Sequence, residues 1–153
     1  MRNRRLAFAI PSGFAAMFLT VSLSEFVSFR FFPLGAEMER AFAMRQANDP
    51  GATDAIAAAL PTVPLGAFIA LIAGWSLGTL ASVLVTATIA PFYRMQLAIG
   101  MMCVNLAAIG ANLWLIPHPA WMPLPALLVP LAIGLAIAFK ARAMDARRAN
   151  RLA

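Results

Sequence analysis

The sequence from residue 95 to residue 139 reads MQLAIGMMCVNLAAIGANLWLIPHPAWMPLPALLVPLAIGLAIAF and contains no charged side chain. A helix needs about 20 mostly apolar residues to cross the hydrocarbon core of a bilayer, which is roughly 30 Å thick. This stretch is therefore long enough for two such helices. The segment Ile116-Pro117-His118-Pro119 divides them, because each proline removes a backbone donor and disfavours helix at the residue before it.

Two more apolar stretches lie upstream. Residues 55–93 carry no charge, and residues 6–29 carry only Glu25. We therefore predict four membrane-spanning helices, at about residues 6–32, 62–90, 95–116 and 120–143. Because these runs are continuously apolar, they do not fit the alternating strands of a membrane barrel. The predicted fold class is all-α, a transmembrane four-helix bundle forming one membrane domain over residues 1–153.

The composition excludes other classes of protein. Apolar residues make up 62% of the chain and charged residues 12%, against roughly 25% charged residues in soluble domains. A water-soluble enzyme could not be covered by so few charges, and a disordered chain would be far less hydrophobic. The single cysteine, Cys103, excludes an internal disulfide. The first apolar run is too long for a signal peptide, which favours a retained helix.

The basic residues predict the orientation, since short cytoplasmic loops are enriched in Lys and Arg. With the N-terminus inside, the inner segments hold nine basic residues and the outer segments hold three, Arg30, Arg40 and Arg45. The nine are Arg2, Arg4, Arg5, Arg94, Lys140, Arg142, Arg147, Arg148 and Arg151. This asymmetry predicts two cytoplasmic termini. It also predicts that the basic C-terminal tail contacts anionic lipids rather than nucleic acid.

The segment of about 28 residues from Pro33 to Leu60 is the one long outer loop. Leu34, Met38 and Phe42 recur every four residues, which indicates a short amphipathic helix lying on the membrane. The run at residues 48–51, Asn-Asp-Pro-Gly, is a turn signal. Thr53 or Asp54 is expected to cap a second helical turn over residues 55–60. A covering loop is favoured over a lid or docking surface.

Small residues at four-residue spacing mark faces where membrane helices pack closely. The second helix includes the GxxxG pair Gly74 and Gly78, and the first and fourth helices carry similar series. The predicted packing positions are Gly66, Gly74, Gly78, Ser82, Ser12, Ala16, Thr20 and Gly134. Their spacing alone leaves open whether they serve packing within the chain or a homodimer.

Three polar residues in the spans form the candidate intramembrane site, Glu25, Asn105 and Asn112. An ionisable residue inside a span indicates function by default. Glu25 lies about 29 Å along its helix by rise, so it is expected at the outer interface, with a place inside the bundle on a proton or cation path as the alternative. The two asparagines lie seven residues apart on one face. They are expected to hydrogen-bond between helices, and a substrate site is the alternative.

Catalytic and cofactor signatures are missing from the sequence, which contains no HExxH, GxSxG, P-loop, dinucleotide-binding or CxxC pattern. His118 is expected to be solvated in the outer turn, and a lone histidine makes a poor metal site. We therefore expect no catalytic residues, no metal and no cofactor. The favoured hypothesis is a non-enzymatic accessory or interaction protein with a homo-oligomer or membrane-protein partner. The alternative is a small proton-coupled transporter using Glu25.

Several motifs resemble those of a group of uncharacterised small bacterial four-helix integral membrane proteins. They are Leu77-Gly78-Thr79, the basic turn at residues 93–100, Asn112, and the Pro-x-Pro-x-Trp run from Pro117 to Trp121. The match covers about a third of the chain. Members often carry a histidine where this chain has Trp75. The resemblance implies the four-helix topology and a bacterial inner-membrane location, and it implies no chemistry.

Overall fold

The computed structural model describes residues 2–90 and 92–150, with side chains described over residues 7–90 and 92–146. This part of the chain contains helices and no strands. Its four long helices are α1 (Arg2–Phe31), α4 (Leu65–Ile89), α5 (Arg94–Leu115) and α6 (Pro123–Asn150). Each of them is long and apolar enough to cross a membrane. The predictions of an all-helical chain and of four membrane-capable helices are therefore confirmed.

Proline explains where two helix boundaries differ from the prediction. Helix α4 begins at Leu65 rather than residue 62, because Pro64 is its N-cap and residues 60–62 form a separate 3₁₀ turn, η1 (Leu60–Thr62). Helix α6 begins at Pro123 rather than residue 120, with proline at a first position where its missing N–H is not needed. It also continues to Asn150, beyond the predicted residue 143, because residues 135–150 contain neither glycine nor proline.

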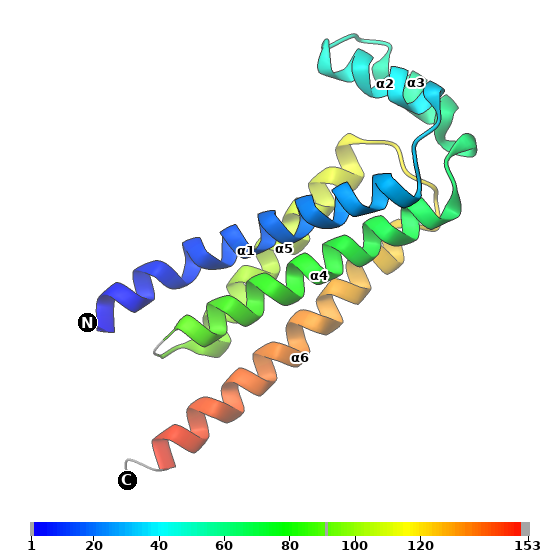
Figure 1. The fold of residues 1–153 in the computed structure, drawn as a ribbon. Helices are drawn as coiled ribbons and strands as arrows, with labels where there is room; N and C mark the ends of the chain where they lie inside the picture. Colours follow the sequence, from blue (N-terminus) through cyan, green and yellow to red (C-terminus); the bar gives the residue numbers. More distant parts are fainter. Residues whose placement is uncertain (1, 91, 151–153) are drawn as a thin grey trace.

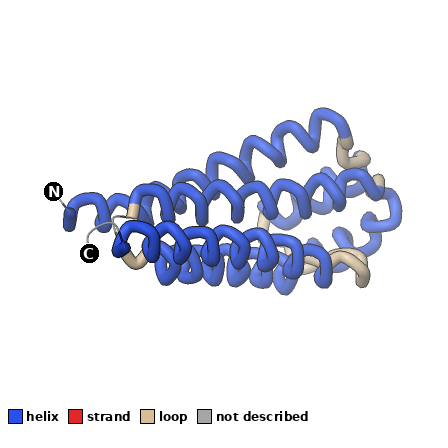
Figure 2. The backbone as a smooth tube through the Cα atoms, turned by 90° about the horizontal axis from the view of Figure 1, so that it is seen from below, coloured by secondary structure: helices blue, strands red, loops and turns tan. Residues whose placement is uncertain are grey.

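The four long helices run alongside one another with alternating direction (Figure 1), and the tube view shows them side by side along most of their length (Figure 2). Helix α4 packs against each of the other three, and α5 and α6 also pack together. Helix α1 packs almost entirely on α4 and meets α5 at only a few residues. The start of α1 and the end of α6 lie at one end of the molecule, and α2 and α3 lie at the other (Figure 1).

Glycines bring α1 and α4 close together. A Cβ added to Gly78 would lie 2.6 Å from Val21 Cγ2, and one added to Gly74 would lie 3.0 Å from Ser24 Cβ. Gly66 lies in the same way against the ring of Phe32, and Gly134 of α6 lies against Met102 of α5. Ser82 is buried, whereas Ser12, Ala16 and Thr20 are half-buried. The buried Gly13, which the sequence analysis did not select, lies against Thr86.

The segment between α1 and α4 folds into a cap, made of α2 (Ala36–Gln46), α3 (Ala52–Ala59) and η1. Its buried core joins α2 to the rest of the cap through Met38, Ala41, Ile56, Ala59 and Val63. The prediction that α2 lies with its apolar residues on the membrane is therefore wrong for Met38, which is only 3% exposed. The apolar face of a short helix can be covered by a neighbouring short helix as well as by lipid, and α3 provides that cover.

The turn between the two cap helices follows the sequence signal. Asn48 adopts a left-handed conformation with φ 56°, and the Gly51 N–H donates to Asp49 Oδ1 at 2.8 Å. The predicted side-chain cap is wrong, because α3 begins earlier than expected. Its N-cap is Gly51 without a side-chain hydrogen bond, so Thr53 and Asp54 both lie within the first helical turn.

Few interactions join the cap to the long helices. The cap helices pack on each other, and the cap core touches the remainder through side chains such as Phe68 and Ile116. One polar contact adds to these, in which Arg45 Nη1 donates to the Leu115 carbonyl oxygen at 3.0 Å. Figure 1 shows the cap standing beyond the ends of α1, α4 and α5.

Candidate functional site

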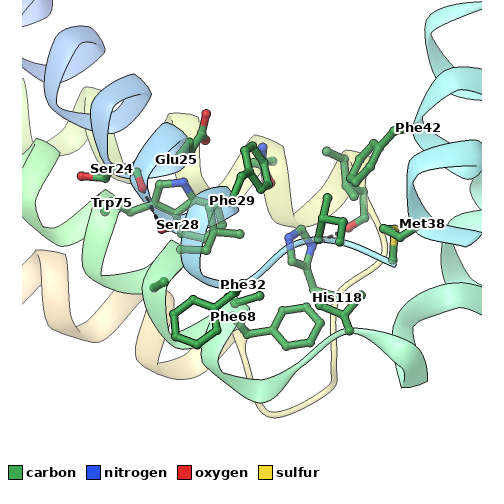
Figure 3. A pocket seen from close by; sticks show the side chains of 18 of the residues that line it. Ser24, Glu25, Ser28, Phe29, Phe32, Met38, Phe42, Phe68, Trp75 and His118 are labelled. Carbon is green, nitrogen blue, oxygen red and sulfur yellow. Dashed lines mark hydrogen bonds between the residues drawn. The ribbon is translucent and has the colours of Figure 1, made fainter. Parts of the chain in front are cut away.

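A cavity of about 270 Å³ lies where the cap meets the long helices. Figure 3 shows that α1, α4, the cap and the segment after α5 all contribute to its wall. Because Phe29, Phe32, Met38, Phe42 and Phe68 lie on its wall, most of the lining is apolar. The other lining residues are Val21, Ser24, Glu25, Ser28, Leu34, Ile56, Leu60, Val63, Ala67, Ala70, Leu71, Gly74, Trp75, Asn112, Ile116, Pro117 and His118.

Helical spacing places the contribution of α1 on a single face. Val21, then Ser24 or Glu25, then Ser28 and Phe32 follow one another at intervals of three or four residues, which puts them in line along the chain. The Ser28 hydroxyl donates to the Ser24 carbonyl oxygen at 2.7 Å, so this serine is satisfied within its own helix. Ser24 lies close to Gly74, so α1 and α4 are in contact at the cavity wall.

Glu25 is the one carboxylate of the cavity wall. Its side chain is half-buried, and no lysine or arginine lines the cavity with it. Within residues 7–90 and 92–146 the single ion pair joins Arg94 to Asp145 at 3.6 Å, and no hydrogen bond reaches the Glu25 carboxylate. Arg30, five residues further along α1, therefore makes no ion pair with it. Glu25 lines the cavity without a positive partner in this part of the chain.

Asn105 and Asn112 occupy different environments although they share one helix. Asn112 is half-buried and lines the cavity together with Glu25. Asn105 is 3% exposed and lies outside the cavity. Its Nδ2 donates to Ser82 Oγ at 2.8 Å and to the Met101 carbonyl oxygen at 2.7 Å. The structure thus brings Glu25 and Asn112 to one site and gives Asn105 an interhelical hydrogen bond.

Further hydroxyl groups lie buried along α4 below the cavity. Thr79 donates to the Trp75 carbonyl oxygen at 3.0 Å, and Ser82 donates to the Thr79 carbonyl oxygen at 3.1 Å. Thr86 reaches across to α1 and donates to the Ala9 carbonyl oxygen at 3.4 Å. These polar side chains are satisfied by neighbouring backbone, as groups in an apolar surrounding must be.

His118 belongs to the cavity, and the expectation that it is solvated is wrong. Its side chain is half-buried, with its ring 6.2 Å from that of Trp75 in an edge-on arrangement. Desolvation lowers the pKa of His118, and the backbone contact of Nδ1 with the Ile116 carbonyl oxygen, at 2.7 Å, opposes this in part. In the neutral ring Nδ1 carries the proton that it donates to this carbonyl, which leaves Nε2 as an acceptor.

The aromatic wall is the part of the site that the sequence analysis missed. Trp75 is 6% exposed and lies on the cavity, and Phe68 is held edge-on against Trp121 with ring centroids 6.3 Å apart. The spacing of Glu25, Phe29 and Phe32 on one side of α1 was a signal for part of this wall. Met38 and Phe42 reach the cavity only because the cap folds over it, and no local sequence pattern predicts that arrangement.

The described side chains offer no group of three or more histidine, cysteine, aspartate or glutamate residues that could hold a metal ion. The polar groups of the cavity wall suit hydrogen bonding and one charge–charge contact. Comparison of the chain with protein-family models, curated proteins and solved structures gives no match.

Proposed function

We propose that this chain is a non-enzymatic integral membrane protein of a bacterial inner membrane that binds a small molecule in its outer cavity. In this role it acts as an accessory or interaction protein, holding or presenting its ligand at the outer face. The observation that carries the proposal is the cavity of about 270 Å³ between α1, α4 and the cap, which is lined mainly by apolar and aromatic side chains. Ligand sites in proteins are concave, mostly apolar and equipped with a few polar groups.

The other parts of the proposal rest on the sequence. The membrane assignment is supported by four helices long and apolar enough to span, and the orientation by the nine-to-three asymmetry of basic residues. The side chains of Arg2, Arg4, Arg5, Arg147 and Arg148, and the whole of Arg151, lie outside the described residues. The bacterial inner membrane is supported by the resemblance of the motifs around Gly78 and Pro117. The non-enzymatic role is supported by the small number of ionisable residues in the spans.

A single-tryptophan variant tests ligand binding directly. Replacement of Trp114 and Trp121 by phenylalanine leaves Trp75 at the cavity as the only tryptophan of the chain. In lipid nanodiscs, energy transfer from Trp75 to the neutral dye N-phenyl-1-naphthylamine should show a saturable component above the linear background from dye in the bilayer.

Cavity filling provides the matched comparison. Ala70→Phe places a ring in the cavity and should remove the saturable component, whereas Ala15→Phe adds the same ring to an exposed position of α1 and should leave it unchanged. Purely linear transfer in the parent protein, or equal loss in both variants, would contradict the proposed binding function.

A second candidate function is proton-coupled transport. It is favoured by the position of Glu25 on the cavity wall and by the buried hydroxyls of Thr79, Ser82 and Thr86, which continue along α4 below it. In this case a proton gradient should drive saturable uptake of alkali or alkylammonium cations into proteoliposomes, and Glu25→Gln should abolish it. Asn112→Leu should then change which cation is carried. Uptake equal to that of empty liposomes would exclude transport of these cations while leaving the binding function intact.

A further inference from the structure

The charge of the cavity wall restricts what the cavity can bind. Among the described residues, Glu25 is the only acidic one on the cavity wall, and no lysine or arginine lines the cavity with it. A half-buried carboxylate without a positive partner is more costly than one that is paired, so a bound cation would be favoured over a neutral or anionic molecule. His118 does not supply that positive charge at neutral pH, because its pKa is lowered.

The aromatic side chains favour a particular kind of cation. Phe29, Phe32, Phe42, Phe68 and Trp75 line the same cavity as Glu25. Aromatic faces attract ammonium groups that carry apolar substituents, and several rings around one site are typical of quaternary ammonium recognition. Small hydrated metal ions would gain little here, since they require several oxygen ligands in place of water.

The size of the cavity limits the length of the ligand. An apolar cavity of about 150 Å³ holds a benzene molecule. The volume of about 270 Å³ therefore suits one ring or branched alkyl group together with a substituted ammonium group. It is too small for the two acyl chains of a phospholipid. A zwitterionic headgroup would also bring its phosphate near Glu25 with no basic residue on the cavity wall to balance it.

We infer that the cavity binds a small free organic cation, an alkylated or aryl-substituted ammonium compound, with Glu25 as its counter-charge and the aromatic wall around its apolar groups. This inference rests on the proposed binding function and adds the chemical class of the ligand. Trp75 and Phe68 are held by their contacts with His118 and Trp121, so part of the aromatic wall is already in place before a ligand binds.

Benzyltrimethylammonium and its uncharged isostere neopentylbenzene form the probe pair. They have the same shape, and the quaternary nitrogen cannot titrate. Binding of the cation is measured by calorimetry in nanodiscs, and binding of the neutral probe by displacement of the dye from the Trp75 site. We expect the cation to bind at least about tenfold more tightly than its isostere, which corresponds to roughly 1.4 kcal/mol.

Two isosteric variants test whether cation binding depends on the charge of Glu25 itself or on negative charge elsewhere in the protein. Glu25→Gln should weaken cation binding about tenfold and leave the neutral probe unchanged, which also shows that the cavity has survived. Glu39→Gln removes the same charge from an exposed position of the cap, outside the cavity, and should change neither affinity. Phosphocholine, a headgroup without its chains, should bind at least about tenfold more weakly than benzyltrimethylammonium.

The outcomes distinguish this inference from the proposed function. If the dye binds saturably but the cation and its isostere bind equally, or if Glu25→Gln leaves cation binding unchanged, the cavity binds ligands but the inference is wrong. Equal affinity for phosphocholine would assign the cavity to lipid headgroups and would also overturn it. If neither dye nor cation binds, the proposed function fails together with the inference.

Discussion

Individual polar side chains in the long helices differ in whether the protein already satisfies them. Asn105 is buried and donates to Ser82 and Met101, whereas Glu25 lines a cavity with no partner among the residues described. Asn112 shares the helix of Asn105 and the cavity of Glu25. Asn105 therefore serves helix association, whereas Glu25 and Asn112 are available to a ligand.

The hydrogen bond between Asn105 and Ser82 should contribute measurably to stability. A double-mutant cycle with Asn105→Ala and Ser82→Ala should give a coupling energy between about 0.6 kcal/mol, the average for such bonds between membrane helices, and about 1.7 kcal/mol, the maximum. Unfolding in mixed micelles with increasing denaturing detergent provides the free energies. A cycle that pairs Asn112→Ala with Ser82→Ala is the control, since Asn112 makes no contact with Ser82, and it should show almost no coupling. Equal coupling in both cycles would contradict this assignment.

His118 should titrate below the ordinary histidine pKa of about 6.5. Because it is the only histidine of the chain, the NMR signal of ¹⁵N-histidine-labelled protein reports its titration without overlap. Desolvation disfavours the charged ring, so the unfolded chain binds the proton more readily than the folded protein. The contribution of His118 to the free energy of unfolding is therefore fully present above pH 6.5. It is lost as the pH falls toward the lower pKa of the folded protein. His118→Gln should remove this dependence, and a midpoint at or above 6.5 would contradict the desolvation of the half-buried ring.

Among the helices, α4 is the element on which the others assemble. It packs against α1, α5 and α6, and its buried residues include Gly74, Gly78 and Ser82. In a membrane the apolar side chains gain little from leaving lipid, so close packing and buried hydrogen bonds hold helices together. Glycine and serine allow both, since they let a neighbouring backbone approach.

Glycine substitutions should therefore depend on which face of a helix they occupy. Gly78→Ala should destabilise the protein by about 1–3 kcal/mol, because the new methyl group meets Val21 of α1. Gly110→Ala on α5 is the matched control, with open space around the position of its Cβ. It should be neutral or slightly stabilising, since alanine favours helix by up to about 1 kcal/mol. Detergent-induced unfolding measures both, and equal losses would show that the α1–α4 contact is not the cause.

At the scale of the whole molecule, the cavity lies at the opposite end of the long helices from the start of α1 and the end of α6. The cap lies at the same end, over the cavity (Figure 1). With the proposed orientation, the cavity lies toward the outer face of the membrane. A ligand would then reach it without crossing the bilayer.

Cysteine labelling tests this orientation. In a Cys103→Ser background, the thiol introduced by Asp49→Cys in the cap should react with a membrane-impermeant maleimide added to intact cells. The thiol introduced by Asn150→Cys should react only after the membrane is opened. Both positions should react equally in detergent, which controls for local accessibility. The reverse pattern would place the cap in the cytoplasm and overturn the proposed topology.

The sequence alone determined the helical class and the four membrane-capable segments, because continuous apolar runs of spanning length and the breaks at proline are local properties of the chain. It also identified Glu25 and Asn112 as polar residues within those segments, and Asn48 and Asp49 as a turn. Only the tertiary structure decided that Glu25 and Asn112 share a cavity, that Asn105 does not, and that His118 and Trp75 join them. These relations depend on how α1 and the cap pack on α4. Such contacts join residues far apart in the chain through shape and close approach, which periodicity along one helix cannot encode.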